Sequence, residues 1–249
     1  MYFPRTEREK VICNAGSRIM NTYVYHTASG YVMVDTGYEK GLAGVLKKLG
    51  KQGIDISEIK YVFLTHAHDD HAGFLNELLG ENTELQVIMS DKAMPTLKRG
   101  QNSFYGGCST LFAWIFCKLM GLVGKADHRF PPIEDRYNDR FIEITAENKR
   151  ELEALLEGEI IFTPGHTSDS ISLKRGDMIF CGDAAMNGVP SAKRLIIWIE
   201  NLADFESSWD TLIASGAKTV YPAHGKPFDV SDLVKYKSAI AKIKLRKLK

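Results

Sequence analysis

The chain has 249 residues, of which 44% are hydrophobic and 25% charged, and its formal net charge is +1. This composition is ordinary for a globular protein and excludes a disordered chain. The near-zero net charge excludes a global field that would recruit nucleic acid or an anionic membrane, so we expect a small-molecule substrate selected by local contacts.

Residues 1–10 carry charges where a secretory signal would need an apolar run, and no uncharged stretch is long enough to span a bilayer. We therefore expect a cytoplasmic protein with no membrane span. The four cysteines are widely spaced and form no Cys-x-x-Cys pair, so they are expected to be reduced and mostly in the core. Because no repeat or linker divides the chain, we expect one domain over residues 1–249.

Short runs rich in β-branched and aromatic residues alternate with helical patterns along the chain, and this alternation predicts sheets covered by helices. Helices are expected at residues 42–49, ended by Gly50, and at residues 74–79 and 205–214. Strands are expected at residues 23–26, 31–35, 61–65, 85–89, 159–162, 171–173, 178–181 and 218–221.

The stretch over residues 98–140 has no clear strand pattern and contains the strongly apolar segment 111–120. We interpret it as an insertion. The segment is either a buried helix, or a cap that walls the active site with Phe112, Trp114 and Phe116, or a patch that forms a homodimer.

A dense cluster of metal-ligand side chains follows the strand expected at residues 61–65. The sequence reads His66-Ala67-His68-Asp69-Asp70-His71, with three imidazoles and two carboxylates. Neutral imidazole and carboxylate are the usual ligands of zinc and related divalent ions. The cluster therefore indicates a metal site at a strand end, whereas a solvated turn that happens to be rich in His is the alternative.

Three later loops each place one ligand-type residue beside Gly or Pro, directly after an expected strand. They contain His166 in Thr-Pro-Gly-His-Thr, Asp183 in Cys-Gly-Asp and His224 in Pro-Ala-His-Gly. His26 and His128 lie outside these loops and are interpreted as structural. Asp35 is either a carboxylate that orients a metal-bound imidazole or a turn-capping residue.

Taken in order, these motifs resemble the metallo-beta-lactamase superfamily over most of the chain, and they resemble its lactonase and glyoxalase II-like branch most. The resemblance implies an α/β fold, a four-layer αβ/βα sandwich of two mixed β-sheets flanked by helices. It also implies two divalent metal ions, zinc first, with iron or manganese as alternatives. The implied ligands are His66, His68 and His166 for the first metal, Asp70, His71 and His224 for the second, and Asp183 for both.

The same resemblance implies a hydrolase in which a metal-bridging hydroxide attacks an ester, lactone, thioester or phosphoester, with Asp70 and Asp183 in catalytic roles. Beta-lactamases of the superfamily commonly carry Cys or Ser in place of Asp183, so antibiotic hydrolysis is not expected. The second His of Gly-His-Thr-x-Gly-His is absent after His166, which weakens assignment to the lactonase and glyoxalase II subgroups. Two alternatives share the cluster: a mononuclear iron persulfide dioxygenase and a ribonuclease Z-like phosphodiesterase.

The last part of the chain carries seven cations and no acid. With apolar residues at helical spacing, it is read first as a surface helix, against a nucleic-acid or membrane contact. The cations are Lys235, Lys237, Lys242, Lys244, Arg246, Lys247 and Lys249.

Overall fold

A computed structural model describes residues 12–124 and 126–248. The chain forms two compact units, the first made of Met1–Gln101 and Arg129–Glu159, the second of Asn102–His128 and Ile160–Lys249. The expectation of a single domain stays a prediction, and the proposed insertion at residues 98–140 is divided between the units. None of the described helices combines the length and apolar character needed to cross a membrane.

The first unit is built on a six-stranded sheet in the order β1-β2-β3-β4-β5-β7. The β1-β2 and β2-β3 pairs are antiparallel, whereas β3-β4, β4-β5 and β5-β7 are parallel, so the sheet is mixed and β4 lies between two parallel neighbours. The strands are β1 (Cys13–Asn14), β2 (Tyr23–Thr27), β3 (Gly30–Val34), β4 (Ile59–Phe63), β5 (Gln86–Ser90) and β7 (Phe141–Ile144).

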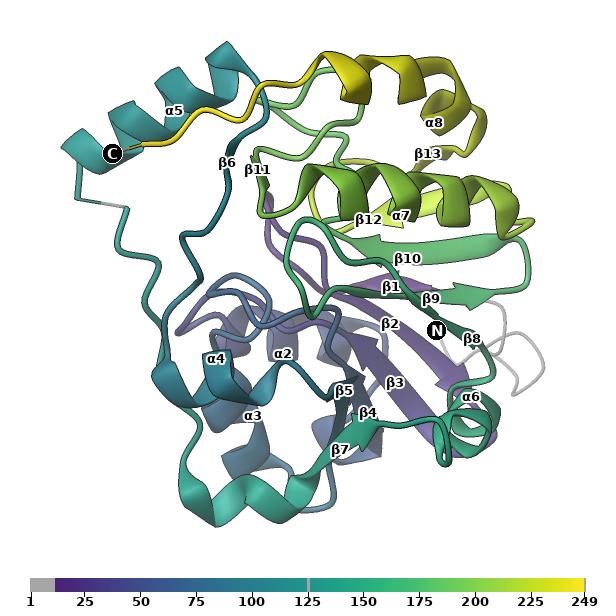
Figure 1. Cartoon of the computed structure of the whole chain (residues 1–249). Coiled ribbons are helices and arrows are strands. Elements are labelled where there is room, and N and C mark those ends of the chain that lie inside the picture. Colours follow the sequence, from purple (N-terminus) through teal and green to yellow (C-terminus); the bar gives the residue numbers. More distant parts are fainter. Residues whose placement is uncertain (1–11, 125, 249) are drawn as a thin grey trace. The chain divides into compact units, whose positions relative to one another are not determined.

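Three helices of the first unit, α2, α3 and α4, bury apolar side chains in the core cluster of this sheet (Figure 1). In α2, for example, Leu42, Val45 and Leu49 are buried in one cluster with Val62 of β4. The helices are α2 (Leu42–Lys51), α3 (Leu75–Glu81), α4 (Met94–Arg99) and α6 (Lys149–Leu156), with 3-10 turns η1 (Ile56–Glu58) and η2 (Asp135–Arg140).

The second unit holds a mixed five-stranded sheet in the order β13-β12-β10-β9-β8. The β10-β12 pair is parallel, and β9-β10 and β12-β13 are antiparallel. The strands are β8 (Glu159–Phe162), β9 (Ile171–Arg175), β10 (Met178–Gly182), β12 (Thr219–Pro222) and β13 (Phe228–Asp229), and a separate pair joins β6 (Gly107–Cys108) to β11 (Trp198–Ile199).

Helix α7 (Leu202–Ala214) supplies Phe205, Trp209 and Leu212 to the core of the second unit. It begins at Asn201, whose side-chain oxygen accepts hydrogen bonds from the backbone N–H groups of Ala203 and Asp204. The remaining helices are α5 (Leu111–Leu122), α8 (Ser231–Tyr236) and the 3-10 turn η3 (Lys237–Lys242). Figure 1 shows α7 lying along β10 and β12.

The expected strands are all present, with ends that differ by up to two residues. The sequence missed β7, α4 and α6, together with the short strands β1, β6, β11 and β13. It was wrong about Gly50, which lies inside α2 rather than ending it. The expected C-terminal surface helix is present in part: α8 and the 3-10 turn η3 cover Ser231–Tyr236 and Lys237–Lys242, and the backbone is extended from Ile243.

The interpretation of segment 111–120 as a buried helix is wrong as well. The segment is helical, but Ala113 is its only buried residue. The helix is apolar on nearly all sides, so the sequence alone could not tell which side faces outward.

Candidate metal centre

The first cluster begins where β4 ends. Because β4 is hydrogen-bonded to β3 on one side and to β5 on the other, the end of this strand is fixed in place. The backbone N–H of Leu64 continues the pairing, donating to the carbonyl oxygen of Ile88 at 2.9 Å. The chain then turns into His66 and its neighbours, as the sequence predicted for a strand-end loop.

A tight turn gathers three imidazoles of this loop. The backbone N–H groups of His71 and Ala72 both donate to the carbonyl oxygen of His68, at 3.0 and 2.8 Å. The ring of His66 consequently lies with its centroid 4.6 Å from that of His68 and 3.9 Å from that of His71. All three residues are buried. Three neutral imidazoles packed this closely can offer several nitrogen ligands to one cation.

Asp35, which follows β3, orients this group. Its Oδ1 accepts a hydrogen bond from the backbone N–H of Thr65 at 2.7 Å, and its Oδ2 accepts one from the Thr65 hydroxyl at 2.9 Å. The same Oδ2 lies 2.8 Å from Nδ1 of His71. With a carboxylate as partner, Nδ1 carries the proton and Nε2 keeps the lone pair that a metal requires. This is the contact with an imidazole that the sequence suggested for Asp35.

Asp70 brings a carboxylate to the same loop. Its Oδ1 lies 3.8 Å from Nε2 of His71, and its Oδ2 accepts a long hydrogen bond of 3.4 Å from the Tyr38 hydroxyl. Asp70 is therefore held next to the ring nitrogen that Asp35 leaves for a ligand. Asp69, which the sequence left outside the ligand set, is half-buried.

In the second unit, His166 is placed by an unusual backbone. Gly165 before it has φ +129°, and a Cβ there would lie 2.3 Å from the backbone nitrogen of Phe205, so only Gly permits this loop to touch the start of α7. Nδ1 of His166 lies 2.8 Å from the carbonyl oxygen of Trp198. A carbonyl can only accept, so Nδ1 donates and Nε2 is again the ligand nitrogen.

Asp183 and His224 follow the parallel pair β10 and β12, and neighbouring parallel strands bring their carboxyl ends to one edge. Asp183 is buried and turns one oxygen to each of two imidazoles. Its Oδ2 lies 3.5 Å from Nε2 of His166, and its Oδ1 lies 3.5 Å from Nε2 of His224.

These two distances fit ligands that share a cation. Two ligand atoms about 2.1 Å from a tetrahedral zinc ion are separated by about 3.4 Å, close to the observed spacing. A hydrogen bond to a carboxylate would be expected at about 2.8 Å instead. The donor set, of neutral imidazoles and carboxylates with no thiolate, suits zinc and other divalent ions of the first transition row.

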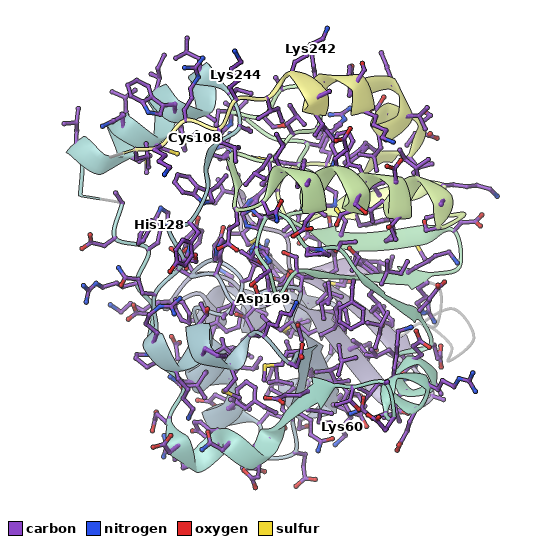
Figure 2. The ribbon with its side chains drawn as sticks, in the orientation of Figure 1. Lys60, Cys108, His128, Asp169, Lys242 and Lys244 are labelled. Atoms are coloured by element: carbon purple, nitrogen blue, oxygen red, sulfur yellow. The ribbon has the colours of Figure 1, made fainter. Side chains whose placement is uncertain are left out.

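Each unit thus brings together its own share of the residues predicted from the sequence. All seven belong to the candidate metal ligands among the described residues: His66, His68, Asp70 and His71 in the first unit, and His166, Asp183 and His224 in the second. The sequence did not find Thr65, Tyr38 or the Trp198 carbonyl, and no local pattern marks them. His26 stacks edge-on against Tyr31, and His128 is exposed (Figure 2), outside the candidate groups.

The sequence model of the metallo-beta-lactamase superfamily matches residues 16–224, which includes every candidate ligand. The chain belongs to this superfamily. Its members include metal-dependent hydrolases, and the resemblance stated from the motifs is confirmed. The superfamily implies binding of divalent metal, in agreement with the His and Asp groups described above.

Curated relatives are distant. The chain is 24% identical to a beta-lactamase-like protein 2 homolog of Caenorhabditis elegans, covering 84% of this chain and 57% of the relative. It is 28% identical to the probable metallo-hydrolase YflN of Bacillus subtilis, covering 68% of this chain and 62% of the relative. The chain therefore spans about three fifths of the length of these relatives.

Solved structures agree on the fold. A metallo-beta-lactamase from Cronobacter sakazakii superposes with a TM-score of 0.64 at 18% identity, covering 93% of this chain and 89% of that one. An archaeal superfamily protein from Sulfolobus tokodaii gives 0.61 at 21% identity, covering 92% and 84%. The expected α/β fold of the metallo-beta-lactamase type, with two mixed sheets flanked by helices, is confirmed.

Proposed function

We propose that this chain is a dinuclear metal-dependent hydrolase that cleaves an ester, lactone, thioester or phosphoester of a small molecule. Two divalent ions, zinc first, would be held by the seven predicted ligands. His66, His68 and His166 would hold the first ion, Asp70, His71 and His224 would hold the second, and Asp183 would be a ligand of both.

One observation carries the proposal: Asp183 turns each carboxylate oxygen to a different imidazole, at 3.5 Å in both cases. A carboxylate with two such neighbours suits a bridge between two cations, with His166 on one and His224 on the other. The orientation of His71 by Asp35 and of His166 by the Trp198 carbonyl adds support, because both leave Nε2 for a metal.

The metals and the side chains of the chain would contribute different parts of the hydrolysis. Bound divalent ions supply Lewis acidity and lower the pKa of water, so that a nucleophile exists near neutral pH. Asp70 is held by Tyr38 on one oxygen, and its carboxylate can hold a proton that leaves the attacking water and later pass it to the leaving group. Asp183, with carboxylate oxygens 3.5 Å from Nε2 of His166 and of His224, can orient the attacking water.

The first test is metal content together with hydrolysis. We expect purified protein to carry about two metal ions per chain by mass spectrometry, as the two ligand sets require. His68→Ala and Asp183→Ala should each remove metal and hydrolysis while far-UV circular dichroism stays unchanged. His128→Asn is the matched control, because His128 is exposed and has φ +43°, which Asn tolerates.

The reaction class is tested with a panel of lactones, thioesters and phosphodiesters after reconstitution with zinc or manganese. Full hydrolysis by metal-free protein in chelator would overturn the proposal. Oxygen uptake with glutathione persulfide and no hydrolysis of any ester would instead assign the alternative dioxygenase activity.

A further inference from the structure

Helix α5 presents an apolar surface that its own unit does not cover. Ala113, Trp114, Cys117 and Met120 lie on the inner side, at positions spaced by about one turn. The opposite side is exposed, and Leu122, for example, is 84% exposed. The exposed apolar residues, here called the α5 face, are Leu111, Phe112, Ile115, Phe116, Leu119, Leu122 and Val123.

The chain's last residues run beside this helix. The backbone of Arg246 exchanges two hydrogen bonds with that of Cys108 in β6, at 2.9 and 3.0 Å. The indole N–H of Trp114 donates to the carbonyl oxygen of Lys247 at 3.0 Å, and Nζ of Lys118 donates to that of Leu248 at 2.7 Å. In Figure 1 the C-terminal segment lies along α5, so both belong to one surface of the second unit.

The C-terminal segment alternates in the manner of an edge strand. Ile243 and Leu245 turn inward and pack against the core of the unit, whereas Lys244 between them is exposed. Figure 2 shows Lys242 at the end of η3 and Lys244 on the extended segment that follows. The exposed cations, here called the cationic rim, are Lys118, Lys242, Lys244, Arg246 and Lys247.

The two stretches of sequence that supply the cationic rim contain no acidic residue. Residues 102–126 contain no Asp or Glu, and after Asp232 the sequence contains none to its end. The two segments that supply the rim therefore carry a net positive charge. Exposed Phe104 and Tyr105, from the loop before β6, add aromatic side chains in the same stretch of chain.

We propose that the α5 face and the cationic rim form a docking surface for an anionic lipid bilayer. An apolar helix face with Phe and Leu enters the boundary between headgroups and acyl chains, while lysines beside it meet anionic headgroups. Helix α5 has 12 residues, too short to cross a bilayer, so it lies in the plane of the interface. The protein binds the surface without spanning it.

Charge distinguishes this partner from a second copy of the chain. A homodimer whose two-fold axis runs across α5 toward the rim would bring the cationic rim against its own copy. Such like-charge contacts oppose association, whereas anionic headgroups are complementary to the rim. A nucleic acid would match the rim, but phosphate and sugar make no use of the exposed Leu, Ile and Val side chains of the α5 face.

The test is flotation of the intact chain with vesicles of phosphatidylcholine, with and without phosphatidylglycerol. We expect the protein to float with the anionic vesicles and not with phosphatidylcholine alone, and we expect high salt to weaken the binding. The variant Phe112→Ser/Leu119→Ser should lose binding by about tenfold or more, since it removes buried apolar area. Ile19→Ser, at an apolar residue 63% exposed in the first unit, is the matched control and should bind like wild type.

The rim is tested separately. Each lysine near an anionic surface contributes about fivefold to binding, so Lys242→Gln/Lys244→Gln/Lys247→Gln should bind roughly a hundredfold more weakly. The matched control neutralises three exposed lysines of the first unit, in the variant Lys47→Gln/Lys51→Gln/Lys92→Gln. Thermal unfolding of each variant shows that the fold is retained.

Several outcomes would overturn the proposal. One is that wild type stays at the bottom of the gradient with both kinds of vesicle. Another is that the rim variant and its control bind equally. A third is that ultracentrifugation shows a dimer that Phe112→Ser/Leu119→Ser dissociates, with no vesicle binding, which would assign the α5 face to a second copy. None of these readouts depends on metal or hydrolysis.

Discussion

Asp35 offers the sharpest perturbation of the candidate metal centre. Its buried carboxylate receives the Thr65 N–H, the Thr65 hydroxyl and the His71 ring N–H, all within 2.9 Å. Asp35→Asn keeps the shape and the left-handed backbone, at φ +57°, because Asn also tolerates this conformation. The variant therefore changes the acceptor Oδ2 into a donor and little else.

The consequence follows from the donor and acceptor roles. An amide NH₂ in place of Oδ2 faces the N–H of His71, and the conflict is relieved only when Nδ1 becomes the acceptor and the proton moves to Nε2. Nε2 then has no lone pair for a metal. We expect metal affinity to fall by about 10- to 100-fold, the usual effect of removing a partner of a metal-bound imidazole. We expect the metal-free protein to lose about 1–3 kcal/mol of unfolding free energy, because a buried bond is disrupted.

Zinc affinity is measured by competition with a chromophoric chelator, and stability by urea denaturation of the metal-free chain. The matched control is Asp91→Asn, since Asp91 is exposed and follows the neighbouring strand β5. Unchanged zinc affinity in Asp35→Asn would refute the role of the carboxylate. An equal loss in Asp91→Asn would show that the effect is not specific to His71.

Two further predictions concern backbone conformation and thiol chemistry. Gly225→Ala should lower the unfolding free energy by more than about 2 kcal/mol, because φ is +93° and a Cβ would lie 1.9 Å from a carbonyl oxygen. Gly176→Ala, at φ +56° with no atom within 4 Å, should cost about 1 kcal/mol, and equal losses in urea denaturation would contradict the clash. A hydrogen bond from the Cys108 thiol lowers the pKa of Cys117, and the same contact raises the pKa of Cys108. The Cys117 thiolate therefore persists to lower pH, so alkylation mapped by mass spectrometry should begin at lower pH there than at Cys108, and Cys108→Ala should move the midpoint for Cys117 upward.

The local sequence was sufficient to predict the kinds of ligand and the loops that carry them. Imidazoles and carboxylates follow β4, β8, β10 and β12, as predicted, because strand propensity and the Gly and Pro residues that end a strand are local properties. Gly165 and Gly225 are examples, since each has a positive φ beside a candidate ligand. The order of these motifs was sufficient to predict the superfamily and its fold.

The partner that orients each ligand depends on long-range contacts and could not be predicted. Asp35 and His71 are 36 residues apart, and His166 and the Trp198 carbonyl are 32 residues apart, so no periodic pattern links them. Sheet pairing and a turn between distant segments set these contacts.

Long-range contacts also explain why the sequence did not predict that α5 is largely exposed. A helix that is apolar on nearly every side has no face that its sequence marks as inner, and the residues that pack against it come from β6 and from the end of the chain. The exposure of a helix depends on which distant segments pack against it. Here the pairing of Arg246 with Cys108 places the end of the chain beside α5, and local sequence does not encode this long-range contact.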